Sequence, residues 1–422
     1  MFIIRSFYVI AIVALLSGCD HDGGEFTVPF VAGYQGAAAS SARPDHAKLV
    51  LSIGFGGSSG DSPLAPLIEY NGLLYGTMAY AGTGCATTFG CGTVFSIDPS
   101  SKAVTILYHF QGDKDGANPM GALLEVNGTL YGTTFNGGGG SGCTAGCGTV
   151  FSLTTSGQET VVHRFFARND GTHPQAGLVA MNGLLYGTTT AGGENNNSSG
   201  TVYSFDPTSG TEKVVYSIGS VDSGAKPEAP LLSYNGLLYG IASAGGTRSP
   251  SGCPSAGCGT VFSIDPTSGQ EKTIHSFGGQ DDGGYPLGGL VAEKDRLYGT
   301  TYFGGGSGCV EDACGTVYAI NPKGDAKIVV HFNGANGRNP SAGLISTGTK
   351  LYGTTLGGGR FNEGTVFEIG PTGGVNLVYS FTGPSEVSEP EAALMLANGI
   401  LYGTATTGPK NSGSGGVFGL RQ

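Results

Sequence analysis

The chain has 422 residues and a formal net charge of −11, and only 12% of its residues are charged. Such an acidic, Arg-poor surface argues against binding to nucleic acid or to anionic lipid surfaces. The 79 Gly residues show no collagen period and are mixed with Val, Leu, Tyr and Phe, which indicates turns and tightly packed strands.

Residues 1–18 are predicted to be a signal peptide. Arg5 supplies a positive charge, and the apolar stretch from Phe7 to Leu16 is too short to span a membrane as a mature helix. The segment ends in Leu-Ser-Gly-Cys19, which resembles the lipobox of bacterial lipoproteins. This resemblance implies that Cys19 becomes the first mature residue and carries a lipid, so we expect a membrane-anchored protein of the bacterial cell envelope. An ordinary cleavage site beside an accidental Cys is the alternative.

Residues 19–47 are predicted to be a flexible tether, because they contain Gly, Ala and Ser runs and little apolar surface to bury. Two short phrases then recur through residues 48–422, each in seven copies. The first, Leu-Tyr-Gly, begins at Leu74, Leu130, Leu185, Leu238, Leu297, Leu351 and Leu401. The second, Gly-Thr-Val-Phe or a near copy, begins at Gly92, Gly148, Gly200, Gly259, Gly315, Gly364 and Gly415. A period of 50 to 59 residues built from short β-type runs predicts a radial β-repeat.

One repeat, residues 174–218, shows the predicted blade. Its four expected strands are Gly177–Met181, Leu184–Thr189, Thr201–Phe205 and Glu212–Ile218. Asn182-Gly183 is a strong signal for a two-residue hairpin turn, and an Asp-Pro-Thr-Ser-Gly turn begins at Asp206. Four antiparallel strands joined in this way make a propeller blade. A Pro that precedes every Leu-Tyr-Gly by eleven residues indicates a rigid entry into the innermost strand.

The two ends of the repeat region predict how the ring closes. The region starts with a lone fourth-strand sequence, Leu49–Phe55, and ends with a third strand, Gly416–Leu420, that has no fourth. We therefore expect the N-terminal strand to complete the last blade, which removes exposed strand edges. The predicted fold is all-β: a monomeric seven-bladed β-propeller of four-stranded antiparallel blades.

The chain has nine Cys, and all except Cys19 fall into local pairs between the two phrases of a repeat. The pairs are Cys85/Cys91, Cys143/Cys147, Cys253/Cys258 and Cys309/Cys314. Local pairs in an exported protein predict disulfides. Metal binding is the alternative, but a tetrahedral site needs four converging ligands and these pairs belong to four different repeats. No metal or cofactor is expected.

The seven phrases, together with Asp-Pro-x-x-Gly between the third and fourth strands, resemble the bacterial GloVer (Gloeo/Verruco) tandem repeat over roughly residues 48–420. This resemblance implies an exported, anchored protein and no assigned activity. The layout is also similar to Kelch repeats, although the Trp of the Kelch fourth strand is replaced by Tyr216, His275 or Tyr379. The Kelch similarity implies that the 2–3 loops and the loops between blades share one face, which is often the binding face.

No catalytic motif stands out. No Ser lies in a Gly-x-Ser-x-Gly elbow, and no Gly-rich phosphate loop has a strand–helix context. His109, His163, His275 and His331 recur near the end of the outermost strand, where they are expected to lie far apart and to serve packing.

Asp115, Asp170 and Asp282 each precede a Gly in a loop between blades. Their side chains are expected to accept hydrogen bonds from nearby backbone N–H groups. The alternative is a ring of acceptors at the channel mouth that binds a cation or sugar hydroxyls.

Residues just after the second strand differ between repeats, and several are aromatic: Tyr80, Phe135, Tyr302 and Phe303. Exposed on a rigid loop face, such side chains stack on sugar rings or anchor a peptide. The alternative is that they pack over the Gly-rich loops.

These observations favour a lipid-anchored binding or scaffold module for a glycan or an envelope protein, with no catalytic residue assigned. An enzyme of lactonase, lyase or glycoside hydrolase type is the alternative, and it requires acids, bases or metal ligands that converge in one pocket. A structural part of an envelope assembly is a third hypothesis, which predicts a large apolar patch.

Overall fold

The computed structural model describes residues 46–422, except 57–58, 86–89, 140–141, 167–169, 195–198, 220–221, 247–256, 280–281, 306–313, 372 and 410–412. The predicted signal peptide and Cys19 lie outside the described residues. Every described strand belongs to one compact unit, Ala39–Gln422, and the described elements are all β-strands. No helix in the described part of the chain has the length and apolar character to cross a membrane.

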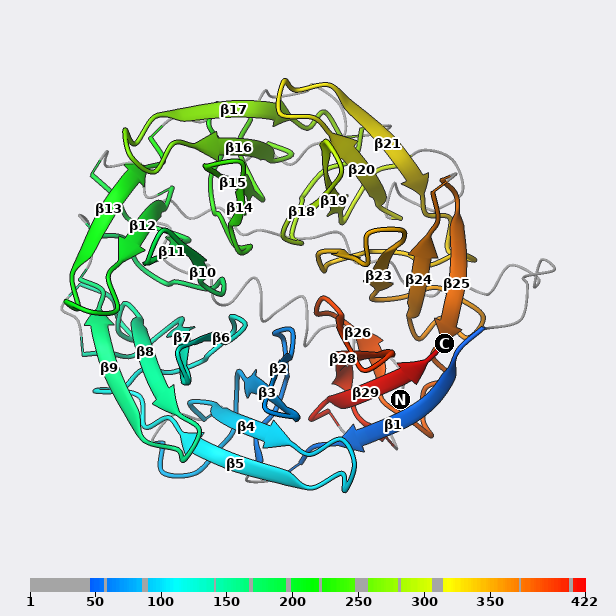
Figure 1. Cartoon of the computed structure of the whole chain (residues 1–422), viewed down its shortest axis with the longest axis horizontal. Helices are drawn as coiled ribbons and strands as arrows, with labels where there is room; N and C mark the ends of the chain where they lie inside the picture. The colour runs from blue at the N-terminus through cyan, green and yellow to red at the C-terminus, as the bar shows by residue number, and fades with distance from the viewer. Residues whose placement is uncertain are drawn as a thin grey trace. The chain divides into compact units, whose positions relative to one another are not determined.

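Seven antiparallel sheets are arranged radially around a central axis, and the first strand of each is innermost (Figure 1). Blade 1 comprises β2 (Ile68–Tyr70), β3 (Leu73–Met78), β4 (Thr93–Ile97) and β5 (Val104–His109). Blade 2 comprises β6 (Leu124–Val126), β7 (Thr129–Thr134), β8 (Thr149–Thr154) and β9 (Glu159–Arg164). Blade 3 comprises β10 (Val179–Met181), β11 (Leu184–Thr189), β12 (Thr201–Phe205) and β13 (Glu212–Ser217).

The next three blades repeat this order. Blade 4 comprises β14 (Leu232–Tyr234), β15 (Leu237–Ala242), β16 (Thr260–Ile264) and β17 (Glu271–Ser276). Blade 5 comprises β18 (Val291–Glu293), β19 (Arg296–Thr301), β20 (Thr316–Ile320) and β21 (Ala326–His331). Blade 6 comprises β22 (Ile345–Ser346), β23 (Leu351–Thr355), β24 (Thr365–Ile369) and β25 (Val375–Ser380). The all-β, seven-bladed prediction is confirmed.

Blade 7 joins the two ends of the propeller, as predicted. It comprises β27 (Met395–Ala397), β28 (Ile400–Thr407), β29 (Gly416–Arg421) and β1 (Lys48–Gly54), and a short extra strand, β26 (Ser388–Pro390), also pairs with β28. In the antiparallel pairing of β1 with β29, Lys48 lies opposite Arg421 and Gly54 opposite Gly416. The ring therefore closes by strand pairing, and no third-strand edge is left open in blade 7.

The predicted hairpin turn of blade 3 has the backbone that Asn-Gly favours. Asn182 and Gly183 both have positive φ, 54° and 81°, as a type I′ turn requires. The first strand begins at Val179 and is therefore shorter than predicted, and Gly177 before it lies against the neighbouring blade. A Cβ on this residue would come within 2.8 Å of the Ala122 carbonyl oxygen.

The phrase Leu-Tyr-Gly-Thr is explained by contacts within and between blades. A Cβ at Gly132 would lie 2.5 Å from Cζ of Phe151, so the Phe ring of the third strand occupies the space above this glycine. The next residue, Thr133, donates a hydrogen bond of 2.9 Å to the carbonyl of Ala176 in the following blade. The recurrence of the Gly in seven repeats and of the Thr in six therefore has a structural cause.

The phrase Gly-Thr-Val-Phe has a similar role. Gly148 has a φ of 94°, and a Cβ there would lie 2.6 Å from Cδ of Pro174, the repeat Pro of the next blade. Thr149 hydrogen-bonds Thr134 of the second strand at 2.8 Å between hydroxyl oxygens. The repeat Pro is thus seated directly on the preceding blade.

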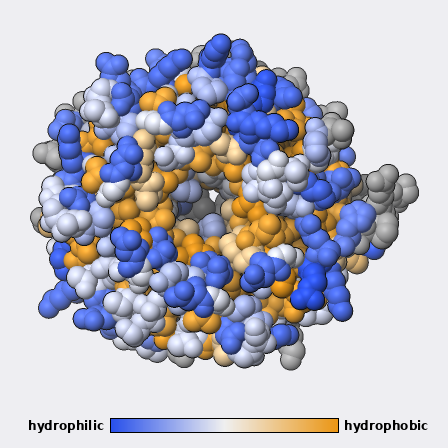
Figure 2. All heavy atoms as spheres, viewed as in Figure 1, coloured by the Kyte–Doolittle hydropathy of each residue, from blue (hydrophilic) through white to orange (hydrophobic). Residues whose placement is uncertain are grey.

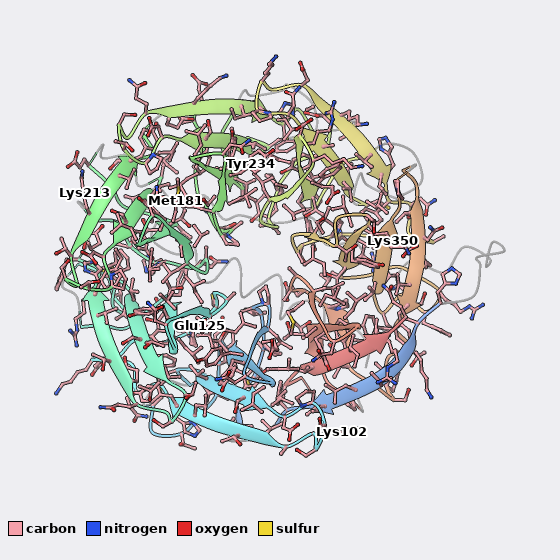
Figure 3. All side chains as sticks on the ribbon, viewed as in Figure 1. Lys102, Glu125, Met181, Lys213, Tyr234 and Lys350 are labelled. Carbon is pink, nitrogen blue, oxygen red and sulfur yellow. A yellow bond between two sulfur atoms is a disulfide. The ribbon has the colours of Figure 1, made fainter. Side chains whose placement is uncertain are left out.

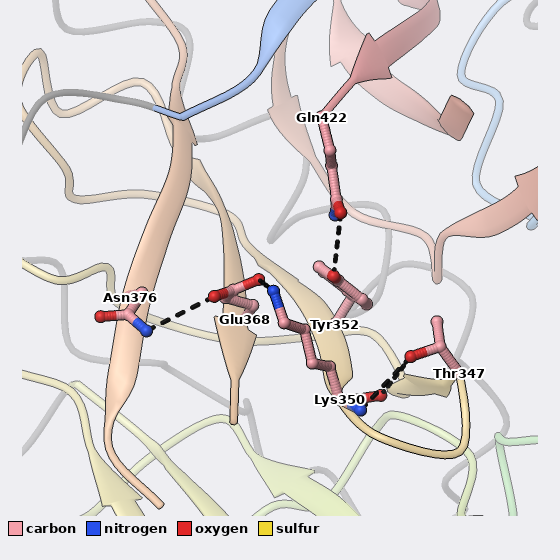
Figure 4. A network of polar contacts seen from close by, with 6 residues as sticks. All are labelled: Thr347, Lys350, Tyr352, Glu368, Asn376 and Gln422. Carbon is pink, nitrogen blue, oxygen red and sulfur yellow. Dashed lines mark hydrogen bonds and ion pairs between the residues drawn. The ribbon is translucent and has the colours of Figure 1, made fainter. Parts of the chain in front are cut away.

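Aromatic and polar contacts also join neighbouring blades. Phe110, which follows the fourth strand of blade 1, packs edge-on against Phe151 of blade 2 with ring centroids 5.1 Å apart. Phe55 and Phe95 make a 5.1 Å contact between blade 7 and blade 1. Figure 4 shows a polar contact of the same kind, in which Tyr352 of blade 6 donates to the Gln422 side chain at 3.1 Å.

Candidate functional site

The residue that precedes each repeat Pro has an unusual backbone. All seven have a positive φ of 53° to 60°, and none is Gly: they are Ser62, Asn118, His173, Lys226, Tyr285, Asn339 and Glu389. A left-handed conformation costs a non-Gly residue energy, and such residues cluster at functional sites. We call these seven residues the mouth ring, because each lies at the entry to the innermost part of its blade. Figure 2 shows the central hollow that the blades enclose.

The disulfides lie directly behind the mouth ring. Cys85–Cys91 and Cys143–Cys147 are bonded as predicted. Cys258 and Cys314 are also disulfide-bonded, and their predicted partners, Cys253 and Cys309, lie outside the described residues.

The second Cys of each pair holds a mouth-ring residue through its carbonyl group. Asn118 and His173 donate their backbone N–H groups to the carbonyls of Cys91 and Cys147, each at 2.8 Å. Tyr285 donates to Cys258 at 2.8 Å in the same way. Each disulfide therefore braces the backbone that orients the next blade's mouth residue.

An aromatic cluster lies at the blade 5 part of the mouth. The ring centroids of Tyr285 and Tyr302 are 6.4 Å apart, and Phe303 lies 4.8 Å from Tyr302 and 5.9 Å from Tyr285. All three side chains are half-buried. Burial and, second, the charge of Glu391 raise the pKa of Tyr302 to about 12. The entry segment of blade 6 lies between these residues, because Asn339 Nδ2 donates to the Tyr302 carbonyl at 3.2 Å and Ser341 Oγ to the Glu391 carbonyl at 3.3 Å.

Two carboxylates of the mouth have unused acceptor atoms. Glu228 and Glu391 each follow a repeat Pro, and in each the Oε2 atom is buried and has no hydrogen-bond partner among the described residues. The Nε atom of Arg338 is also buried and has no hydrogen-bond partner among the described residues. The mouth thus offers buried acceptors and a buried donor that a polar ligand can satisfy.

Burial sets the protonation of both carboxylates. Desolvation, followed by the neighbouring charge of Glu389, raises the pKa of Glu391 to about 7. Desolvation also raises the pKa of Glu228, opposed by a hydrogen bond from Ser243 and by the charge of Lys226. A carboxyl group that is half protonated near neutral pH can either donate or accept a hydrogen bond.

The structure brings the predicted residues Tyr80, Tyr302 and Phe303 to this mouth. Tyr80 pairs with Asp61 as Phe303 pairs with Gly284, so Tyr80 is equivalent to Phe303 and not to Tyr302. Burial, then Asp61 and Glu391, raises the pKa of Tyr80 above its ordinary range.

Phe135, the fourth predicted aromatic residue, is placed differently. It is 4% exposed, and its ring centroid lies 4.7 Å from that of His173. Phe135 therefore fits the alternative that these aromatic residues pack over the Gly-rich loops, whereas Tyr302 and Phe303 of blade 5 are only half-buried.

The predicted aspartates do not lie at the channel. Asp115 accepts hydrogen bonds from Gln111 N at 2.9 Å and from the Tyr108 hydroxyl at 2.7 Å. Asp170 accepts from Phe166 N at 3.1 Å and Asp282 from Gly278 N at 2.9 Å. The expected bonds to backbone N–H groups are present, but these residues lie beside the outermost strands and do not form an acceptor ring around the channel.

The four recurrent histidines occupy two different positions. His163 and His275 lie opposite Val150 and Val261 and approach Asp170 and Asp282. His109 and His331 lie one position later along the strand and contact the 2–3 loops, for example through a 2.7 Å bond between His331 Nδ1 and the Gly305 carbonyl. All four histidines thus lie near the end of an outermost strand, as expected, but at two adjacent positions.

The sequence reasoning missed the mouth ring and the two glutamates. The available signal was the variation around a constant Pro, as in Lys226-Pro-Glu228 and Glu389-Pro-Glu391. Residues that vary beside an invariant structural residue are candidates for a function that differs between blades.

Solved structures with the same architecture have little sequence in common with this chain. Virginiamycin B lyase from Staphylococcus aureus has a TM-score of 0.56 at 12% identity, over 89% of this chain and 100% of that one. An oligogalacturonate lyase in complex with manganese has a TM-score of 0.51 at 12% identity, over 83% and 86%. Oligogalacturonate lyase from Vibrio parahaemolyticus has a TM-score of 0.53 at 9% identity, over 86% and 89%. At these identities the likeness shows the fold alone.

No curated protein matches the chain significantly. A family model does match, in three overlapping segments: residues 40–144, 90–253 and 249–418. The resemblance to Kelch repeats is not confirmed. The chain belongs to the Gloeobacter/Verrucomicrobia repeat family.

Proposed function

We propose that this protein is an exported, lipid-anchored binding module that holds a neutral glycan at the mouth ring. The observation that carries the proposal is the pair of buried carboxylates, Glu228 and Glu391, whose Oε2 atoms lack partners beside the aromatic cluster of blade 5. Sugar hydroxyls donate to such acceptors, and sugar faces stack on aromatic rings.

The charge of the mouth favours a neutral ligand. Glu228, Glu389 and Glu391 share the mouth with Lys226 and Arg338, and the whole chain has a net charge of −11. Acidic polysaccharides would be repelled by this surface. The braced backbone also favours binding, because a rigid site loses little conformational entropy when a ligand binds.

The cellular part of the proposal is supported by the N-terminal sequence and by the disulfides. Cys19 would carry the lipid, residues 19–47 would tether the propeller, and the bonded Cys pairs fit an oxidising compartment. Labelling with radioactive palmitate tests the anchor, and we expect incorporation in the wild type and none in Cys19→Ala.

Glycan binding is tested by isothermal titration of the purified protein with neutral and acidic oligosaccharides. We expect neutral ligands to bind and the Tyr302→Ala/Phe303→Ala variant to lose at least ten-fold in affinity. Glu391→Gln removes a carboxylate acceptor at constant volume and is expected to weaken binding several-fold. Phe361→Ala is the matched control, because Phe361 is 47% exposed and lies outside the mouth ring.

Equal binding by the wild type and the Tyr302→Ala/Phe303→Ala variant would exclude the mouth as the binding site. Absence of binding to every oligosaccharide would contradict the glycan proposal and favour an envelope protein as ligand. Crosslinking in cells would then identify that protein.

A second candidate function, acid–base catalysis on the same ligand, is favoured by one observation. Glu391 has a pKa of about 7, which suits a general acid or base at neutral pH. Mass spectrometry of the incubated oligosaccharides separates the two functions. Cleavage products that the wild type forms and Glu391→Gln does not would indicate an enzyme. Oligosaccharides that stay intact with the wild type would indicate binding alone.

A further inference from the structure

The outer edge of the propeller carries a repeated junction between neighbouring blades. The fourth strand of one blade ends beside the start of the next blade's fourth strand, as Figure 1 shows for β9 and β13. At this junction lie His163 near the end of β9, Asp170 in the following loop and Glu212 at the start of β13. Figure 3 shows Lys213, the neighbour of Glu212, at the perimeter of the ring and far from the central hollow.

The three side chains direct their ligand atoms toward one point. One imidazole nitrogen and one oxygen from each carboxylate all lie within 4.8 Å of one another. His163 Nε2 is 3.3 Å from Asp170 Oδ2, yet it is buried and makes no hydrogen bond among the described residues. Glu212 Oε1 is likewise buried and unpartnered. This half-buried cluster therefore leaves donor and acceptor capacity unused at two buried atoms.

No Lys or Arg among the described residues pairs with the two carboxylates. In the described parts of the chain, the ion pairs that involve Lys or Arg do not include Asp170 or Glu212. A cation bound between Asp170 and Glu212 would supply the positive charge that no Lys or Arg provides there.

Other junctions of the same propeller serve as internal comparisons. At the junction of blades 1 and 2, Tyr108 replaces the His, and its hydroxyl donates to Asp115 at 2.7 Å. At the junction of blades 4 and 5, His275 lies 3.2 Å from Asp282, but Ala326 occupies the position of Glu212. Among the described residues, a complete set of three ligands is found at the junction of blades 2 and 3.

We propose that His163, Asp170 and Glu212 bind one Zn²⁺ ion, which ties blade 2 to blade 3. Imidazole and carboxylate are ordinary zinc ligands, and three of them leave a coordination position for water. The His163 and Asp170 side chains are 17% and 19% exposed, so the cluster lies close to the protein surface. Zinc–ligand distances of about 2.0–2.2 Å require only small side-chain rotations to draw these atoms together.

The test is isothermal titration of the purified full chain with ZnCl₂ after removal of metal by EDTA, together with metal analysis. We expect the wild type to bind one more zinc than Glu212→Gln, whose affinity at this site falls at least ten-fold. His163→Tyr introduces the residue that blades 1 and 3 carry as Tyr108 and Tyr216, so it should fold and also lose one zinc. Glu271→Gln, at the equivalent of Glu212 one blade later, is the matched control and should bind as the wild type does.

A gain-of-site variant makes the test stricter. Ala326→Glu adds the missing carboxylate to His275 and Asp282, and it should bind one additional zinc. Anomalous X-ray scattering at the zinc edge would locate each ion. Zinc should also raise the melting temperature of the wild type and not that of Glu212→Gln.

The proposal is overturned if the wild type binds no zinc, or if Glu212→Gln and His163→Tyr both bind as many ions as the wild type with equal affinity. An Ala326→Glu variant without additional zinc would show that these three positions do not suffice for a site.

Discussion

The hydroxyl of Thr404 in blade 7 donates a hydrogen bond of 3.1 Å to the carbonyl of Ala65 at the entry to blade 1, across 339 positions of sequence. The same bond joins other neighbouring blades, for example Thr133 to Ala176 at 2.9 Å. Closure of the ring thus reuses a contact that every Leu-Tyr-Gly-Thr phrase can make. Blade 4 is the exception, because Ile241 replaces the Thr there.

Thr404→Val should test this contact. Val keeps the shape of the side chain but leaves the Ala65 carbonyl without its donor, so we expect the free energy of unfolding to fall by about 1–2 kcal/mol. Urea denaturation measures the change. Thr105→Val, on an exposed part of β5, is the control, and an equal effect of both substitutions would refute an interblade role for Thr404.

Deletion of residues 46–55 should open the ring. It removes β1 and so uncovers Val417, Phe418 and Leu420, which are fully buried. Loss of the buried Leu51 and Phe55 and exposure of their partners should cost roughly 5 kcal/mol or more. Calorimetry should show a lower melting temperature, and the dye ANS should bind.

A deletion of the same length in the predicted tether, residues 25–34, is the control for the closure experiment. Its melting temperature should match that of the wild type. If deletion of residues 46–55 also left the melting temperature unchanged, β1 would contribute nothing to closure.

Removal of the Cys143–Cys147 disulfide should destabilise the backbone that holds His173 of the mouth ring. Cys143→Ser/Cys147→Ser opens a short loop, for which the chain-entropy model gives about 2 kcal/mol. Because the Cys147 carbonyl holds His173, we also expect more mobility at that part of the mouth. Urea denaturation measures the loss of stability, and amide hydrogen exchange measures the mobility near His173.

Mass mapping under non-reducing conditions completes the disulfide test. It should find the two described bonds and also Cys253–Cys258 and Cys309–Cys314. Free thiols at these positions in envelope-matured protein would contradict both the pairing and the oxidising compartment.

The fold was predictable because its signals are local and repeated. Asn182-Gly183 specifies a turn, and a lone strand at each end specifies the closure at Lys48 and Arg421. The site was less predictable because it depends on which side chains converge across the ring. No sequence spacing indicates that the charge of Glu391 acts on Tyr302. The equivalence of Tyr80 with Phe303, in contrast, could have been read from their equal distance to Leu-Tyr-Gly.

The cluster of His163, Asp170 and Glu212 was also difficult to predict from the sequence. The sequence places His163 on an outermost strand, and from that position alone a packing role was the better expectation. Its approach to Glu212 depends on how the outer strands of two blades meet end to end. That geometry follows from blade twist, which a linear repeat does not reveal.

The stability of the propeller should depend on pH through Glu391. Its pKa rises from an ordinary value near 4.5 to about 7 on folding, because burial and then Glu389 disfavour the charged form. The folded state therefore binds the proton more tightly, so stability is greatest below pH 4.5 as far as this group is concerned, and it falls as the pH rises through 7. Glu391→Gln should flatten this part of the profile and raise stability at pH 8 by about 1–3 kcal/mol.

Urea denaturation at pH 5 and pH 8 measures the free energy of unfolding of both proteins, with Glu69→Gln, at an exposed position of β2, as the control. An unchanged pH profile in Glu391→Gln would show that this carboxyl group is hydrated in the folded protein, and the mouth would then lack the buried acceptor on which the proposed glycan site depends.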